Sequence, residues 1–149
     1  MNSRLPKSQS LVFHLADGAQ LFLRSIRQWL ASAKQGECGC CAMRSEYQAY
    51  GIEAALPVLT EIMCFLLLVT NDELDIQESA DVETSDTEIS VLRMMIAVEA
   101  NQPSAAYELA SDYFSPPVAT TFIRICDCMI EHYKHAGLVF AGTPTLRLV

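Results

Sequence analysis

The sequence is poor in positive charge, and its excess of acids is confined to one stretch. Its net charge is −8, from 10 Lys and Arg against 18 Asp and Glu. The excess acids all lie in residues 72–88, which contain no Lys or Arg, and the remaining acids and bases balance. Binding to DNA or RNA requires a basic stripe that neutralises phosphates. The charge distribution therefore predicts that this protein does not bind nucleic acid directly.

The sequence also lacks a long apolar run. The longest unbroken run covers residues 62–69, far short of the roughly 20 residues that cross a bilayer. The apolar residues 11–16 are too few for a secretory signal and precede no small-residue cleavage motif. We therefore expect no membrane segment. Six cysteines without an export signal indicate reduced thiols and a cytoplasmic location.

Recognisable catalytic motifs are missing as well. There is no G-x-S-x-G nucleophile setting and no glycine-rich phosphate loop. The acidic stretch lacks the glycine and the spacing of a calcium loop. No Glu-x-x-His pair suited to a di-iron bundle occurs. These absences favour a non-enzymatic protein over an enzyme.

The apolar side chains that are present fall into helical stripes. They make up 51% of 149 residues, enough for one hydrophobic core in a single domain. Apolar residues recur every three to four positions. This spacing predicts helical regions over residues 10–36, 42–70, 85–101, 103–114 and 115–137. Between and after them we expect an acidic loop at 71–84 and a tail at 138–149, either an extended strap or disordered.

Local signals place the ends of these helices. Ser85 and Glu88 form a capping-box pattern before an apolar run. Pro103 and Pro116 suit the first positions of helices, and Gly51 suits a helix end. Because the connections are short, we predict an all-α fold, a compact antiparallel bundle of about five or six helices.

Cysteines and histidines are the candidate metal ligands. Cys38, Cys40 and Cys41 lie in a glycine-containing loop. The last helix adds candidates at helical spacing on one face, namely Cys128, His132 and His135. Together they offer the thiolate and imidazole ligands of a tetrahedral zinc site, although the C-x-C-C spacing departs from the usual zinc motifs.

Simpler interpretations compete with zinc. Histidines near a helix C-terminus interact favourably with the helix dipole, without binding any metal. An exposed loop thiol with a lowered pKa can sense oxidants, although the sequence shows no Lys or Arg cluster to lower it, and Glu37 opposes the shift. The sequence is therefore interpreted in two ways, as a protein that binds zinc or as one that binds no cofactor.

The charge density suggests a covered surface. Outside residues 72–88 roughly 15% of residues are charged, below the roughly 25% usual for soluble domains. An apolar helix face covered by a partner explains this deficit, most simply a second copy in a homodimer. The candidate interface is a row on the last helix, made of Ile123, Cys126 and Ile130.

Two functions follow from these patterns. The first is a non-enzymatic helical interaction or regulatory protein that binds a second copy of itself or another protein. The alternative is a zinc-like metal-binding or thiol redox-responsive protein that uses the CGCC loop and the last helix.

Overall fold

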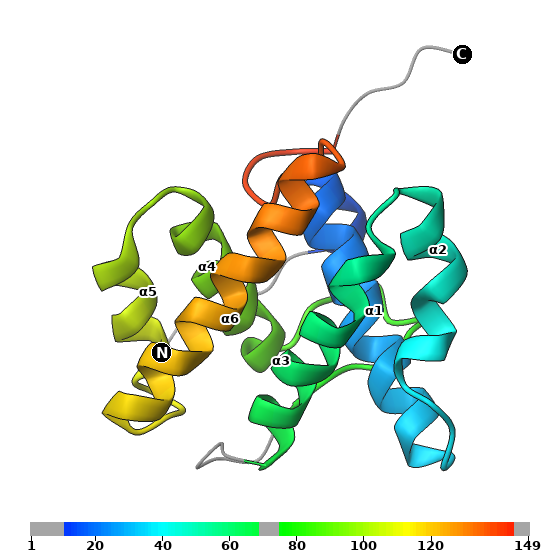
Figure 1. The fold of residues 1–149 in the computed structure, drawn as a ribbon, viewed down its shortest axis with the longest axis horizontal. Helices are drawn as coiled ribbons and strands as arrows, with labels where there is room; N and C mark the ends of the chain where they lie inside the picture. Colours follow the sequence, from blue (N-terminus) through cyan, green and yellow to red (C-terminus); the bar gives the residue numbers. More distant parts are fainter. Residues whose placement is uncertain (1–10, 69–74, 145–149) are drawn as a thin grey trace, which may run out of the picture.

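The computed structural model describes residues 11–68 and 75–144, and it is predominantly helical (Figure 1). The parts of the predicted regions at residue 10 and at residues 69–74 and 145–149 lie outside these ranges. Within them the chain forms no β-strand. Its helices are α1 (Asp17–Lys34), α2 (Arg44–Ala49), α3 (Leu56–Leu68), α4 (Asp86–Glu99), α5 (Pro103–Ala110) and α6 (Pro116–His135). The predicted all-α class is confirmed.

A hydrophobic core receives side chains from every one of these helices. The largest fully buried ones include Phe22 of α1, Tyr47 of α2, Leu59 of α3 and Phe122 of α6. Helix α6 packs against α3, α4 and α5, and Figure 1 shows it crossing the middle of the molecule. The antiparallel arrangement and the single domain stay predictions.

The first helix begins later than residue 10. Residues Val12–His14 form a 3-10 turn, and Ala16 is extended with ψ of 158° before α1 begins at Asp17. The amide of Gly18 donates to the carbonyl oxygen of Val139 at 2.8 Å. A Cβ at Gly18 would lie 2.4 Å from that oxygen, so only glycine allows this approach. The C-terminal segment therefore docks on the beginning of α1.

The described part of the tail, residues 138–144, forms a bent strap that packs on the core. Leu138 and Phe140 are buried, and the Phe140 ring lies 5.6 Å from that of Phe22 and 5.2 Å from that of Tyr133. The amide of Phe140 donates to the carboxylate of Glu99 at 2.8 Å. The strap therefore joins α1, α4 and α6.

The region predicted at 42–70 contains two helices separated by a turn. Gly51 has a φ of 75°, a conformation that glycine adopts without strain, and it ends α2. The 3-10 turn Glu53–Ala55 leads into α3, with Pro57 in its first turn. The end of α3 is more exposed than its apolar sequence suggests, because Leu68 is 78% exposed.

Residues 75–85 of the acidic segment contain no helix, but hydrogen bonds from the side chain of Arg27, on α1, hold them in place. The guanidinium of Arg27 donates to both carboxylate oxygens of Glu88 at 2.8 and 2.9 Å. It also donates to the carbonyl oxygens of Asp81 at 2.7 Å and Glu83 at 3.0 Å. The ion pair between Arg27 and Glu88, together with these backbone contacts, thus ties the segment to α1 and α4, while most side chains of residues 75–83 stay exposed.

The predicted starts of the last three helices are confirmed by their first residues. Ser85 accepts from the Glu88 amide at 3.2 Å, and the Ser85 amide donates to Glu88 at 3.0 Å, which completes the capping box. Pro103 opens α5 and Pro116 opens α6. Helix α5 ends at Ala110 and not at residue 114.

Candidate functional site

The best-developed cluster of chemically reactive groups is a turn of three thiols between α1 and α2. We call residues 38–41 the thiol turn. Its second half belongs to the 3-10 turn Cys40–Met43, which packs against α1, α2 and α3. Cys38 and Cys41 are exposed and Cys40 is half-buried, and all are free thiols. The predicted loop therefore presents its sulfurs to solvent.

The thiol turn rests on the side chain of Trp29. A Cβ at Gly39 would lie 2.4 Å from the indole ring, so the glycine backbone is in direct contact with it. The indole nitrogen of Trp29 donates to the hydroxyl oxygen of Thr60 on α3 at 3.3 Å. Trp29 is the one tryptophan in the sequence. Its ring therefore links the thiol turn to α1 and α3.

The sulfurs interact with one another, and this shifts their acidity. The Cys38 and Cys40 sulfurs are 3.6 Å apart, within hydrogen-bonding distance for thiols. The pKa of the Cys38 thiol is lowered to about 7, mainly by hydrogen bonds from Cys41 and next by one from Cys40, which favour its thiolate. The pKa of Cys41 is raised, because its own proton is held by Cys38. A sizeable fraction of Cys38 is therefore thiolate near neutral pH.

Arg44, the first residue of α2, places a positive charge beside the thiol turn. Its guanidinium hydrogen-bonds Cys41, which raises the pKa of Arg44. It also donates to the Glu53 carboxylate at 3.1 Å, and both side chains are about half exposed. This cation is not predicted from the sequence, because a single arginine forms no cluster along the chain. The 3-10 turn Cys40–Met43 is local structure, and its spacing brings Arg44 next to Cys41, three residues earlier.

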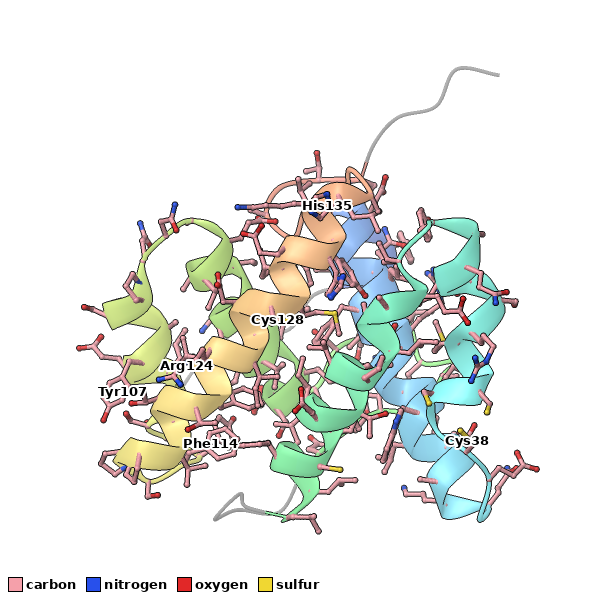
Figure 2. The ribbon with its side chains drawn as sticks, in the orientation of Figure 1. Cys38, Tyr107, Phe114, Arg124, Cys128 and His135 are labelled. Atoms are coloured by element: carbon pink, nitrogen blue, oxygen red, sulfur yellow. The ribbon has the colours of Figure 1, made fainter. Side chains whose placement is uncertain are left out.

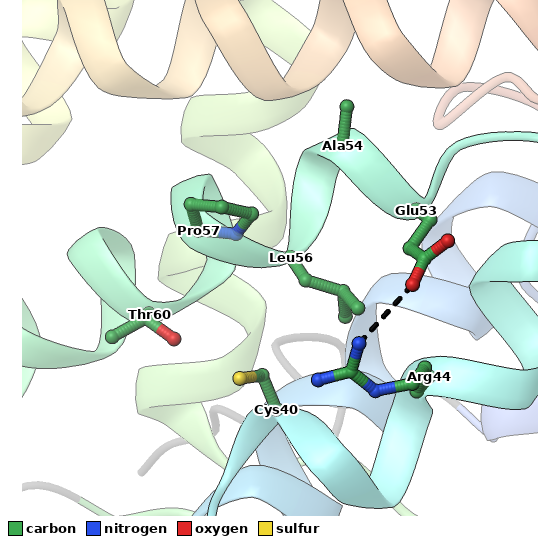
Figure 3. Close-up of a pocket in the computed structure, with 7 residues that line it drawn as sticks. All are labelled: Cys40, Arg44, Glu53, Ala54, Leu56, Pro57 and Thr60. Atoms are coloured by element: carbon green, nitrogen blue, oxygen red, sulfur yellow. Dashed lines mark hydrogen bonds and ion pairs between the residues drawn. The ribbon is translucent and has the colours of Figure 1, made fainter.

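A pocket of about 630 Å³ opens beside the thiol turn (Figure 3). This volume falls in the range of small-molecule sites. The sulfur of Cys40 lies at its edge and points toward Thr60, and the Arg44–Glu53 ion pair lies on another side. The apolar wall comes from the start of α3 and the turn before it, through Ala54, Leu56 and Pro57. The pocket thus combines a thiol, a cation, a carboxylate and an apolar surface.

The helix that follows the thiol turn is anchored by buried hydroxyl groups. The Tyr47 hydroxyl lies 2.8 Å from the hydroxyls of both Ser25 and Tyr133. Burial raises the pKa of both tyrosines, most strongly that of Tyr133. They are therefore neutral, and this chain of hydrogen bonds fixes α2 to α1 and α6. No local sequence pattern predicts these hydrogen bonds, because the hydroxyls come from positions far apart in the chain.

The structure does not assemble the predicted zinc site. Figure 2 shows Cys38 at one side of the molecule, while Cys128 and His135 lie along α6. Within residues 11–68 and 75–144, no three His, Cys, Asp or Glu side chains converge as metal ligands. The structure therefore does not bring the CGCC loop together with Cys128, His132 and His135, because α6 packs mainly on α3, α4 and α5.

The predicted interface row is wrong for two of its three residues. Cys126 and Ile130 are buried in the core of the chain itself, and burial raises the pKa of the Cys126 thiol. Their apolar character fills the interior and does not mark a surface. Ile123 is half-buried and lines an open groove between α5 and α6.

Comparison of the chain with protein-family models, curated proteins and solved structures finds no match. Within the part of the chain that the structure describes, no helix has the length and apolar character needed to cross a membrane.

Proposed function

We propose that this protein is a redox-responsive regulatory protein, in which a two-electron oxidant converts the thiol turn to a Cys38–Cys40 disulfide. The observation that carries the proposal is the 3.6 Å separation of these two sulfurs in an exposed turn. Redox-sensing cysteines are accessible, rich in thiolate and adjacent to a second thiol. Cys38 has these three properties.

The chemistry with a peroxide takes two steps. The Cys38 thiolate attacks one peroxide oxygen, the O–O bond breaks, and Cys38 becomes a sulfenic acid while hydroxide leaves. Cys40 then attacks the Cys38 sulfur, forms the S–S bond and displaces the hydroxyl group as water. The two sulfurs together lose two electrons, which reduce the peroxide to water. A thiol reductant reverses the change.

Disulfide formation changes the surface around the turn. The two sulfurs must approach from 3.6 Å to about 2.05 Å. Because Gly39 lies on Trp29 and Cys40 borders the pocket, this movement changes the contact with the indole and the shape of the pocket. The pocket is therefore the surface at which a binding partner detects the oxidised state.

The proposal includes a cytoplasmic location. The turn responds to oxidants only where its thiols are normally reduced, and the cytosolic glutathione and thioredoxin systems maintain that state. Glutathione-dependent reduction then resets the disulfide.

Peroxide kinetics test the proposed function. Reduced protein is treated with hydrogen peroxide at pH 7, and its free thiols are counted over time. We expect the wild type and C128S to lose two thiols rapidly and reversibly, whereas C38S and C40S do not. Cys128 is a matched control because it is exposed on α6. Equal rates in C38S and the wild type would contradict the proposal.

Self-association is a second candidate function, favoured by the groove between α5 and α6. The groove measures about 560 Å³ and is lined by Tyr107, Glu108, Thr120 and Ile123, among others. Its mixture of an aromatic, an aliphatic and a charged side chain is suited to a two-fold contact between identical surfaces. Light scattering tests it: we expect a dimer that I123E converts to monomer, and a monomeric wild type would overturn it.

A further inference from the structure

We propose that the pocket beside the thiol turn binds the zwitterionic end of a small amino-acid disulfide, which oxidises the turn by thiol–disulfide exchange. The inference rests on the proposed function and names the class of oxidant. It follows from the placement of one thiol, one cation and one carboxylate around a single pocket.

The charges of the pocket match an α-amino acid. The guanidinium of Arg44 presents several donors to a carboxylate, and the carboxylate of Glu53 accepts from an ammonium group. These two side chains pair with each other at 3.1 Å, and each is about half exposed, so their outer faces are open to a ligand. A ligand with both charges on one carbon pairs with both residues at once.

The remaining walls suit the rest of such a ligand. Ala54 and Pro57 are both exposed and provide an apolar surface for a short methylene chain. Cys40 brings its sulfur to the edge of the same pocket (Figure 3). We therefore place the disulfide of the ligand along the wall between the ion pair and Cys40, and the volume of about 630 Å³ leaves room for both halves.

The exchange balances without a further reactant. The Cys40 thiolate attacks one ligand sulfur, the ligand S–S bond breaks, and the other half leaves as a thiolate that takes up a proton. The Cys38 thiolate then attacks the Cys40 sulfur, 3.6 Å away, and releases the first half as a second thiol. The protein dithiol is oxidised to a disulfide and the ligand disulfide is reduced to two thiols.

Three disulfides of similar size test this inference. Cystine carries both charges on each half, cystamine lacks the carboxylates, and dithiodipropionate lacks the ammonium groups. The protein is the full chain with C38S and C41S, in which Cys40 is the one remaining thiol of the turn, so its mixed disulfide persists. Peptide mass spectrometry measures adducts on Cys40 relative to those on Cys128, which corrects for the intrinsic reactivity of each reagent.

We expect the Cys40 to Cys128 ratio to be roughly fivefold higher with cystine than with either analogue, the upper range for an exposed ion pair. R44Q should abolish the advantage over cystamine, and E53Q the advantage over dithiodipropionate. R93Q on α4 makes the same charge change as R44Q away from the pocket lining and should have no effect.

Two failures can be distinguished. Equal ratios for the three reagents overturn the amino-acid site, while rapid peroxide oxidation of Cys38 and Cys40 in the wild type leaves the proposed function standing. Conversely, a preference for cystine without any Cys38–Cys40 disulfide in peroxide-treated wild type retains the binding site and overturns the redox function.

Discussion

At the scale of single residues, the cysteines differ in environment far more than their sequence pattern suggests. Cys38 is exposed beside two other thiols, whereas Cys126 is fully buried in the core. Hydrogen bonds from Cys41 and Cys40 lower the pKa of Cys38, while desolvation raises the pKa of Cys126. The first is therefore a candidate nucleophile and the second a small apolar side chain.

The pH dependence of Cys38 reactivity should show that Cys41 lowers the pKa of Cys38. A thiolate reacts and a thiol does not, so the alkylation rate rises with pH and reaches half its maximum near the pKa of about 7. In C41A, which removes the side-chain hydrogen bond from Cys41, the largest cause of the shift, we expect the midpoint to move up. Iodoacetamide labelling with peptide fragmentation measures both profiles.

C128S serves as the control for this titration and should leave the midpoint near 7. A midpoint at about 8.5 in the wild type, the value of an ordinary cysteine, would show that the hydrogen bonds do not act as described.

At the scale of elements, the local signals in the sequence were sufficient for helices but not for the contacts between them. The capping box at Ser85 involves neighbouring residues, so its sequence pattern predicts it directly. By contrast, Arg27 contacts Glu88 across 61 positions, and no local pattern reveals that pair. The sequence therefore predicts an acidic loop but not the contacts with Arg27 that hold it against α1.

The same reason explains the candidate site. The thiols of the turn are adjacent in sequence and were identified, but Trp29 and Thr60 reach it only through the packing of α1 and α3. The proposed link to Cys128 and His132 failed, because helical spacing says which residues share a face but not which element that face contacts.

The buried ion pair gives a stability prediction at this scale. R27M leaves the carboxylate of Glu88, which is fully buried, without its cation, and we expect a loss of about 3–5 kcal/mol in the free energy of unfolding. Arg24 lies on α1, as Arg27 does, and forms an exposed ion pair with Glu46 of α2. R24M removes this pair and should lower the free energy of unfolding by about 1 kcal/mol or less. Urea unfolding measures both, and equal losses would contradict the bracing role of Arg27.

At the scale of the whole molecule, the thiol turn is a local feature on a firmly joined helical framework. The strap with Phe140 and the hydroxyl chain through Tyr47 connect elements far apart in sequence. Oxidation joins two residues of one turn and requires no helix to move. The response is therefore expected at Trp29 and the pocket, not in the helices.

Spectroscopy distinguishes a local change at Trp29 from a change in the helices. Because the sequence has one tryptophan, its fluorescence reports the contact between Trp29 and Gly39. We expect peroxide to change the emission of the wild type and a thiol reductant to restore it, while the far-ultraviolet circular dichroism stays constant. C40S should show neither change. A loss of helical signal on oxidation would contradict a local response.

The central claim is that Cys38 and Cys40 form the disulfide, and peptide mass spectrometry tests it most directly. Trypsin cleaves after Lys34 and Arg44, so one peptide carries Cys38, Cys40 and Cys41 and no other cysteine. After peroxide treatment and alkylation, we predict that this peptide has lost two hydrogen atoms and carries a single alkyl group, on Cys41. Alkylation of all three cysteines after oxidation would contradict the account.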